Sequence, residues 1–240
     1  MKKKLFTIAV AVALIAIMVS GSLAYFTAED KVDNTFTIGS VLIEIFENNE
    51  ATASDTIAFT KPLTPVVNAT PSADKSYIPK AVKVKNTGLN AAYIRTHLAI
   101  PTKLVDYLML DLNTADGWTQ VGTATVTGDY TVYTFDYTNK VEANTFTPDL
   151  LKGVYLASDV DIKDNPDTAT ADLEFCKPNG DGTYTFSGFT AHSKVTDGYE
   201  SATVNVLVAS QAIQAQGFNS GATNALNSGF GTGTNPWQSR

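Results

Sequence analysis

The chain has 240 residues, 44% of them hydrophobic, and a formal net charge of −7 from 17 Lys and Arg against 24 Asp and Glu. This apolar content excludes an intrinsically disordered chain, which buries too little apolar surface to offset the entropy of folding. The acidic excess argues against nucleic acid or an anionic membrane as a partner, because both bind clustered positive charge.

The N-terminus has the three parts of a secretory signal peptide. Lysines occupy positions 2–4, an almost unbroken apolar stretch covers 5–19, and the small residues Ser22 and Ala24 stand at positions −3 and −1 of a cleavage site. The apolar stretch is shorter than the ~20 residues that cross a membrane, which favours cleavage over a membrane anchor. We therefore predict cleavage before Tyr25 and a secreted mature chain.

Removal of the signal peptide, residues 1–24, would leave 14 Lys and Arg against 24 Asp and Glu, a formal charge of −10. A mature chain of about 216 residues suits one all-β domain. The lone cysteine, Cys176, has no partner for an internal disulfide. Its strand-like surroundings favour a half-buried structural residue over a catalytic thiol. Because no internal disulfide can form, the stability of the fold must come from sheet packing or from neighbouring subunits.

The mature sequence predicts many short strands. Val82 and Val84 alternate with Lys83 and Lys85, the pattern of a strand with one buried face and one wet face. Similar alternation, or β-rich runs bounded by turn residues, predicts strands at 41–46, 92–100 and 202–209 and hairpins that join 121–126 to 131–137 and 172–176 to 183–189.

Helix signals are few. A helix is expected at 103–112 after Pro101, residues 150–157 fit either a helix or a strand, and a short helical turn is expected within 221–230. Residues 217–240 are rich in Asn, Gly, Ser and Thr, which predicts a loosely held, flexible tail. The pattern as a whole predicts an all-β jelly-roll sandwich over 25–216, with one or two short helices in its connections.

The residues that hydrolytic enzymes need are scarce. A catalytic zinc site uses about three protein ligands, often two histidines one helical turn apart. The only histidines are His97 and His192, neither in such a motif, and His97 is expected to be a half-exposed strand residue. Metal chemistry would require the fold to bring the two together. We therefore expect no enzyme activity, no metal and no cofactor.

An acidic cluster lies at 159–167, where Asp159, Asp161, Asp164 and Asp167 could offer oxygen ligands to calcium. The stretch lacks the glycine and the terminal glutamate of an EF-hand loop. A solvated acidic loop is therefore the favoured interpretation.

The residues around the predicted cleavage site resemble a known family. Residues 23–27, Leu-Ala-Tyr-Phe-Thr, followed by 34–43 are similar to the N-terminus of the TasA/camelysin family, and weaker similarity returns at 78–95 and 201–214. The resemblance implies a jelly roll, processing by a dedicated signal peptidase, and assembly into fibres of a biofilm matrix or the cell surface. The implied partners are other copies of the chain and other matrix components.

The start of the mature chain, residues 25–34, is a candidate donor strand. Added to the sheet edge of another subunit, such a strand would satisfy main-chain groups and bury its aromatic side chains. Head-to-tail donation does not close into a ring and so produces filaments. A frayed end and a strand in its own sheet are the alternatives, and the resemblance favours donation. The donor residues are Tyr25, Phe26, Thr27, Ala28, Glu29 and Asp30.

The sequence thus predicts a secreted homopolymer, a structural fibre subunit rather than an enzyme. Two other functions are open. The camelysin branch carries a peptidase label, which implies a surface metalloprotease. A glycan-binding jelly roll would use exposed aromatic side chains such as Trp118, Tyr130 and Tyr133.

Overall fold

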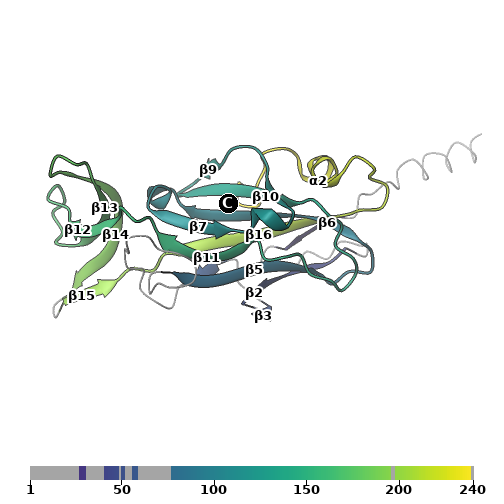
Figure 1. Cartoon of the computed structure of the whole chain (residues 1–240), viewed down its shortest axis with the longest axis horizontal. Coiled ribbons are helices and arrows are strands. Elements are labelled where there is room, and N and C mark those ends of the chain that lie inside the picture. Colours follow the sequence, from purple (N-terminus) through teal and green to yellow (C-terminus); the bar gives the residue numbers. More distant parts are fainter. Residues whose placement is uncertain are drawn as a thin grey trace, which may run out of the picture.

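The computed structural model describes residues 27–30, 41–48, 50–51, 56–58, 77–195 and 198–238. In these parts of the chain two sheets stack face to face, and a third sheet lies at one end of the stack (Figure 1). The all-β prediction is confirmed as a sandwich. The more specific jelly-roll topology stays a prediction.

Sheet A is built around two long central strands, and all its strand pairs are antiparallel. Two short strands, β4 (Thr56–Ala58) and β9 (Thr125–Thr127), pair with β16 and β10 respectively. The main path across the sheet is β1 (Thr27–Asp30), β16 (Asn205–Gln214), β6 (Ala92–Pro101), β10 (Tyr130–Tyr137) and β8 (Trp118–Gln120).

Sheet B is the second layer of the sandwich, and it too is antiparallel throughout. Alternation in β5 turns Val82 and Val84 into the core, while Lys83 and Lys85 are only half-buried, as the sequence predicts. The strand order is β3 (Glu50–Ala51), β2 (Ile43–Glu47), β5 (Ile78–Asn86), β11 (Leu151–Leu156) and β7 (Leu108–Leu112).

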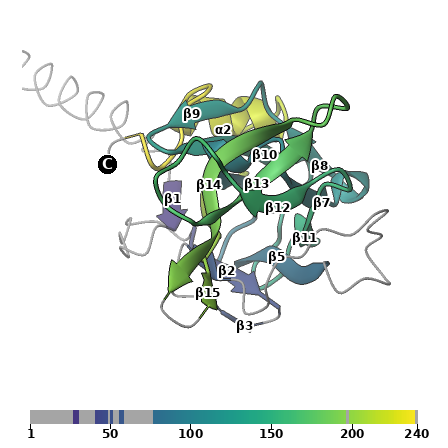
Figure 2. The same cartoon turned by 90° about the vertical axis from the view of Figure 1, so that its left-hand side faces the viewer.

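Sheet C is a smaller antiparallel sheet that projects from one end of the sandwich, and Figure 2 looks directly onto it. Lys103 and Tyr107 hold it in place: Lys103 Nζ donates to the Gly188 carbonyl at 2.8 Å, and Tyr107 Oη donates to the Thr185 carbonyl at 3.1 Å. Its strands are β12 (Asp161–Asp164), β13 (Leu173–Pro178), β14 (Tyr184–Val195) and β15 (Gly198–Ser201).

Both predicted hairpins are present. β9 and β10 are joined by a turn at Gly128, whose φ of 57° is easily reached only without a side chain. β13 and β14 form the second hairpin. The turn at 86–90, in contrast, carries the chain from sheet B into sheet A: the buried amide of Asn86 donates to the carbonyls of Asn90 and Val141 at 2.8 and 2.9 Å.

The predicted helix at 103–112 is wrong. Only Thr102–Leu104 forms one turn of 3-10 helix, and the chain then enters strand β7. Leu108, Leu110 and Leu112 fit the period of a strand as well as that of a helix, and pairing with β11 decides between them. The ambiguous stretch at 150–157 becomes strand β11 for the same reason.

The C-terminal segment, residues 217–238, forms a third layer over the outer face of sheet A (Figure 1). Its helix α2 (Ala222–Phe230) buries Ala225 and Leu226 against Ile213 of β16. Trp237 is 7% exposed and packs in a cluster with Ala99 and Val132. This packing differs from the loosely held tail expected from the composition, because a few apolar residues on one helix face suffice to dock it.

Candidate functional site

The edge of sheet A along β16 is the region that pairs with β1, the described part of the predicted donor segment. On one side β16 pairs with β6 from Leu207 to Gln214. On the other side it pairs with two short strands: β4 opposite Asn205–Leu207 and β1 opposite Ser210–Ile213. The register of β1 is antiparallel, with Thr27 opposite Ile213, Ala28 opposite Ala212, Glu29 opposite Gln211 and Asp30 opposite Ser210.

Both faces of β16 are buried, so only its edge is left for a further strand. Val206, Val208 and Ala212 belong to the main core between sheets A and B. Ala209 and Ile213 point the opposite way, into the clusters under the C-terminal segment. A strand whose two faces are fixed has a strongly specified register, because a slip of one residue would reverse both faces.

A buried ion pair joins β6 to β10 in the centre of sheet A, under the C-terminal segment. Arg95 Nε and Nη2 donate to the two carboxylate oxygens of Asp136 at 2.7 and 3.0 Å, and both side chains are completely buried. The same guanidinium donates to the Gly231 carbonyl at 2.9 Å and to Asn227 Oδ1 at 2.7 Å. Arg95 therefore ties the third layer to the centre of sheet A.

His97 is the next outward-facing residue on β6, and it is fully buried. The expected half-exposed position is wrong, because the C-terminal segment covers this face and Trp237 packs edge-on against the imidazole, with ring centroids 6.4 Å apart. The two ring nitrogens lie 3.0 Å from Thr134 Oγ1 and 3.1 Å from Gln211 Oε1. Burial lowers the pKa of His97 from 6.5 to about 4, against the opposing effect of the Gln211 hydrogen bond.

The fold does not bring the two histidines together. His97 lies in sheet A, whereas His192 is half-buried in β14 of sheet C, with its Nδ1 3.2 Å from Ser201 Oγ. Within the described residues, no group of three or more His, Cys, Asp and Glu side chains has a geometry that could hold a metal ion.

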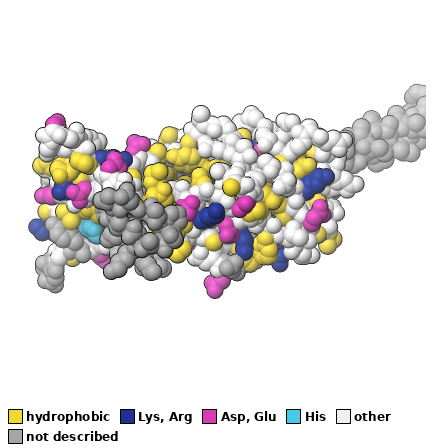
Figure 3. Space-filling model, in the orientation of Figure 1, with side chains coloured by type: hydrophobic (Ala, Val, Ile, Leu, Met, Phe, Trp, Pro, Cys, Tyr) yellow, Lys and Arg dark blue, Asp and Glu magenta, His cyan; other side chains and the backbone are white. Residues whose placement is uncertain are grey.

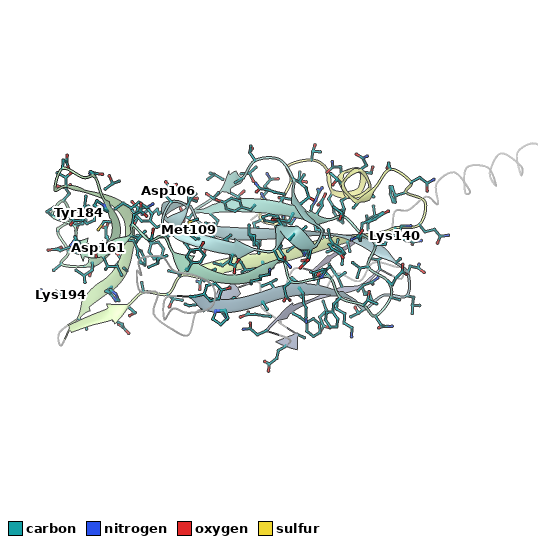
Figure 4. All side chains as sticks on the ribbon, in the orientation of Figure 1. Asp106, Met109, Lys140, Asp161, Tyr184 and Lys194 are labelled. Carbon is teal, nitrogen blue, oxygen red and sulfur yellow. The ribbon has the colours of Figure 1, made fainter. Side chains whose placement is uncertain are left out.

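The acidic stretch at 159–167 makes local contacts. Asp159 pairs with Lys177 at 2.9 Å, and Asp161 pairs with Lys163 at 3.0 Å, a hydrogen bond that lowers the pKa of Asp161. Figure 4 shows Asp161 and Tyr184 at the outer end of sheet C, with Asp106 and Met109 where sheet C meets the sandwich.

Two other candidates are more buried than the sequence suggests. Cys176 is 0% exposed rather than half-buried, and burial raises the pKa of its thiol. Trp118 is 1% exposed: it packs against Tyr137, and its Nε1 donates to the Pro148 carbonyl at 3.0 Å. Trp118 is thus unable to stack on a glycan, and Tyr130 and Tyr133 are half-buried.

The predicted site residues divide into two groups. Ser22, Ala24, Tyr25 and Phe26 lie outside the described residues. Thr27, Ala28, Glu29 and Asp30 form β1, which pairs with β16 of the same chain. The contribution of the C-terminal segment to this side of sheet A is missing from the sequence interpretation. Its signals were Phe218, Leu226, Phe230 and Trp237, four large apolar residues in a tail that is otherwise small or polar.

The face of the molecule in Figure 3 intersperses basic and acidic side chains over its described part. None of the helices described is long and apolar enough to cross a membrane. Comparison with protein-family models, with curated proteins and with solved structures finds no match to this chain. The resemblance to the TasA/camelysin family stays a prediction.

Proposed function

We propose that this protein is an exported structural subunit that polymerises head to tail into extracellular fibres, by donation of its mature N-terminal strand to the β16 edge of the next copy. The observation that carries the proposal is the way this edge is completed. A strand of four residues, β1, covers the part of β16 from Ser210 to Ile213. In the fibre, the same residues of a neighbouring copy take this place.

The chemistry of a strand edge supports the exchange. An uncovered edge presents unpaired N–H and C=O groups, which bind another extended segment through main-chain hydrogen bonds. Exchange of an identical element between copies preserves the register and needs no new surface. A short strand paired on one side is among the least stable parts of a sheet, so it opens more readily than β6 or β10.

Cleavage before Tyr25 supplies the free end that donation requires. Burial of the Tyr25 and Phe26 side chains would contribute roughly 1.5–3 kcal/mol each. The entropy lost in ordering the segment opposes this gain, and the main-chain hydrogen bonds to β16 add to it. The margin at each contact is modest, but it recurs at each junction of the fibre.

The resemblance of residues 1–46 to TasA/camelysin proteins supports the remaining parts of the proposal. These parts are export, processing by a dedicated signal peptidase, and a place in a biofilm matrix or on the cell surface beside other matrix components. N-terminal sequencing of the secreted protein should begin Tyr25-Phe26-Thr27. A start several residues away, or a leader retained in mature fibres, would contradict the processing step.

The direct test is deletion of residues 25–30 from the mature chain. The variant should stay soluble and monomeric, with near-wild-type circular dichroism, because the central strands of sheet A and the core are intact. A synthetic peptide of residues 25–34 should bind it. Sedimentation and electron microscopy report assembly, and normal filaments from the deletion variant would show that another interface joins the subunits.

A further inference from the structure

A compact apolar cluster lies at the end of β16 where β1 begins. We call it the α2 cluster: its buried members are Tyr93, Ile213, Ala215, Ala222, Ala225 and Leu226, and Ala91, Phe218 and Phe230 pack against them half-buried. None of these side chains is charged. Three parts of the chain form the cluster: β6 and β16 supply its base, and the C-terminal segment supplies the rest.

The register of β1 leads directly to this cluster. Thr27, the first residue of β1, lies opposite Ile213. The ladder between β16 and β6 runs one residue past β16, since the Ala215 amide donates to the Ala91 carbonyl at 2.8 Å. Continued by two residues in the same antiparallel register, a donated strand would place Tyr25 opposite Ala215.

Strand alternation then fixes the face on which each aromatic side chain falls. Residues directly opposite each other in an antiparallel pair point to the same side of the sheet. Ile213 and Ala215 point toward α2, whereas Ala212 points into the main core. In a donated strand Tyr25 would therefore share the α2 face, and Phe26 would fall on the side of the sheet that faces sheet B.

We propose that the α2 cluster is the docking site for the Tyr25 side chain of the strand donated by a second copy of this chain. The inference rests on the proposed function and adds to it that the C-terminal segment forms part of the polymer interface. A tyrosine suits the position, because its ring buries apolar area among Phe218 and its neighbours while the hydroxyl stays in water at the rim.

The site also gives cleavage a second role. When Tyr25 is the first residue, its ring reaches the cluster with only a small α-amino group beyond it. With the signal peptide attached, Ala24 and the residues before it would have to continue past α2. An uncleaved chain should therefore bind the edge more weakly even where the strand itself is free.

A double-mutant cycle tests the contact. One partner is the peptide of residues 25–34, with or without Tyr25→Ala, and the other is the chain lacking residues 25–30, with or without Phe218→Ala. Each single change should raise Kd by about tenfold, the effect of a buried aromatic contact, and the two together should raise it little further. Phe146→Ala is the matched control, because Phe146 is an exposed phenylalanine that packs on Phe46 of sheet B, and this variant should bind the peptide normally.

The full mature chain provides an independent readout that does not depend on the deletion variant. Tyr25→Ala and Phe218→Ala should each raise the critical concentration for fibre assembly by about tenfold, and the double variant should match the single ones. This docking site would be overturned if the increases in critical concentration of the two single variants multiplied in the double variant. It would also be overturned by a Tyr25→Ala chain that assembles normally. A wild-type peptide that fails to bind, together with normal fibres from the deletion variant, would instead overturn strand donation itself.

Discussion

The two edges of sheet A are completed in opposite ways. At the β10 edge, β8 and β9 come from the chain immediately before β10, and β9 is joined to it by a tight turn. At the β16 edge, β1 and β4 come from the opposite end of the chain. One edge is closed by local hairpin pairing and the other by strands far away in sequence.

This difference decides which edge can serve assembly. A strand tied by a short turn stays at high effective concentration beside its partner, so another chain cannot compete for the place. A strand such as β1, joined to its partner through a long connection, lacks this high effective concentration. The same strand of a neighbouring copy can therefore compete for its place. Under the proposed function, the β10 edge would therefore protect the monomer from association, while the β16 edge would permit exchange.

Proline substitutions at the two edges should separate these roles most strongly. Successive residues of a strand direct their N–H groups to opposite sides, so proline at Ala28 or at Glu29 must remove a hydrogen bond to β16. The more affected of the two variants should lose fibre assembly in sedimentation assays while it keeps a folded sandwich by circular dichroism. Val126→Pro in β9 is the matched change at the other edge and should leave assembly intact.

Loss of Arg95 should produce the largest change in stability. Arg95→Ala would leave the Asp136 carboxylate buried without its partner, which typically lowers the free energy of unfolding by about 3–5 kcal/mol. Asp159→Ala, which removes an exposed ion pair in sheet C, should cost less than about 1 kcal/mol. Urea unfolding measures both, and similar costs would mean that the third layer is not anchored through Arg95.

Acid should lower the free energy of unfolding through His97, which is buried in β6 between β10 and β16. Its folded-state pKa of about 4 lies below the unfolded value of 6.5, so the unfolded chain binds more protons between these two values. This contribution is fully present above pH 6.5, is lost as the pH falls toward 4, and amounts to about 3 kcal/mol. His97→Gln should flatten this part of the stability profile in urea titrations at a series of pH values. An unchanged slope would contradict the burial of a neutral imidazole.

Cys176→Ala should have the smallest effect. The thiol is completely buried in β13, away from both edges of sheet A, so we expect a loss of about 1 kcal/mol and unchanged fibres. Non-reducing gels of wild-type fibres should show single chains. A ladder that disappears in the variant would reveal a covalent link between subunits.

The hairpins were predictable because their information is local. Alternation and the turn residues at Gly128 and at 177–182 are contained within about twenty positions, the range over which sequence patterns report structure. The strand pairing of 103–112 was not predictable, since three leucines fit both periods and only β11, a distant segment, selects the strand.

The outer face of sheet A escaped prediction for a related reason. The pattern at 93–97 is typical of the solvent-exposed face of a strand, formed by Tyr93, Arg95 and His97. No residue near them in the sequence indicates that the C-terminal segment covers them. The pairing partner of the donor residues was equally hidden. Edge strands are distinguished by what lies beside them, and that is a property of the whole fold.

Cross-linking between two single-cysteine chains tests the central claim most directly. In a Cys176→Ala background, one mature chain carries Ala28→Cys and the other carries Ala212→Cys, the two positions that lie opposite each other across β1 and β16. Fibres grown from the mixture and oxidised should yield a disulfide-linked dimer of the two chains, which only donation between copies can produce. If the mixture gives no dimer while a chain with both cysteines closes its own disulfide, β1 remains on its own β16 and the fibre is held together elsewhere.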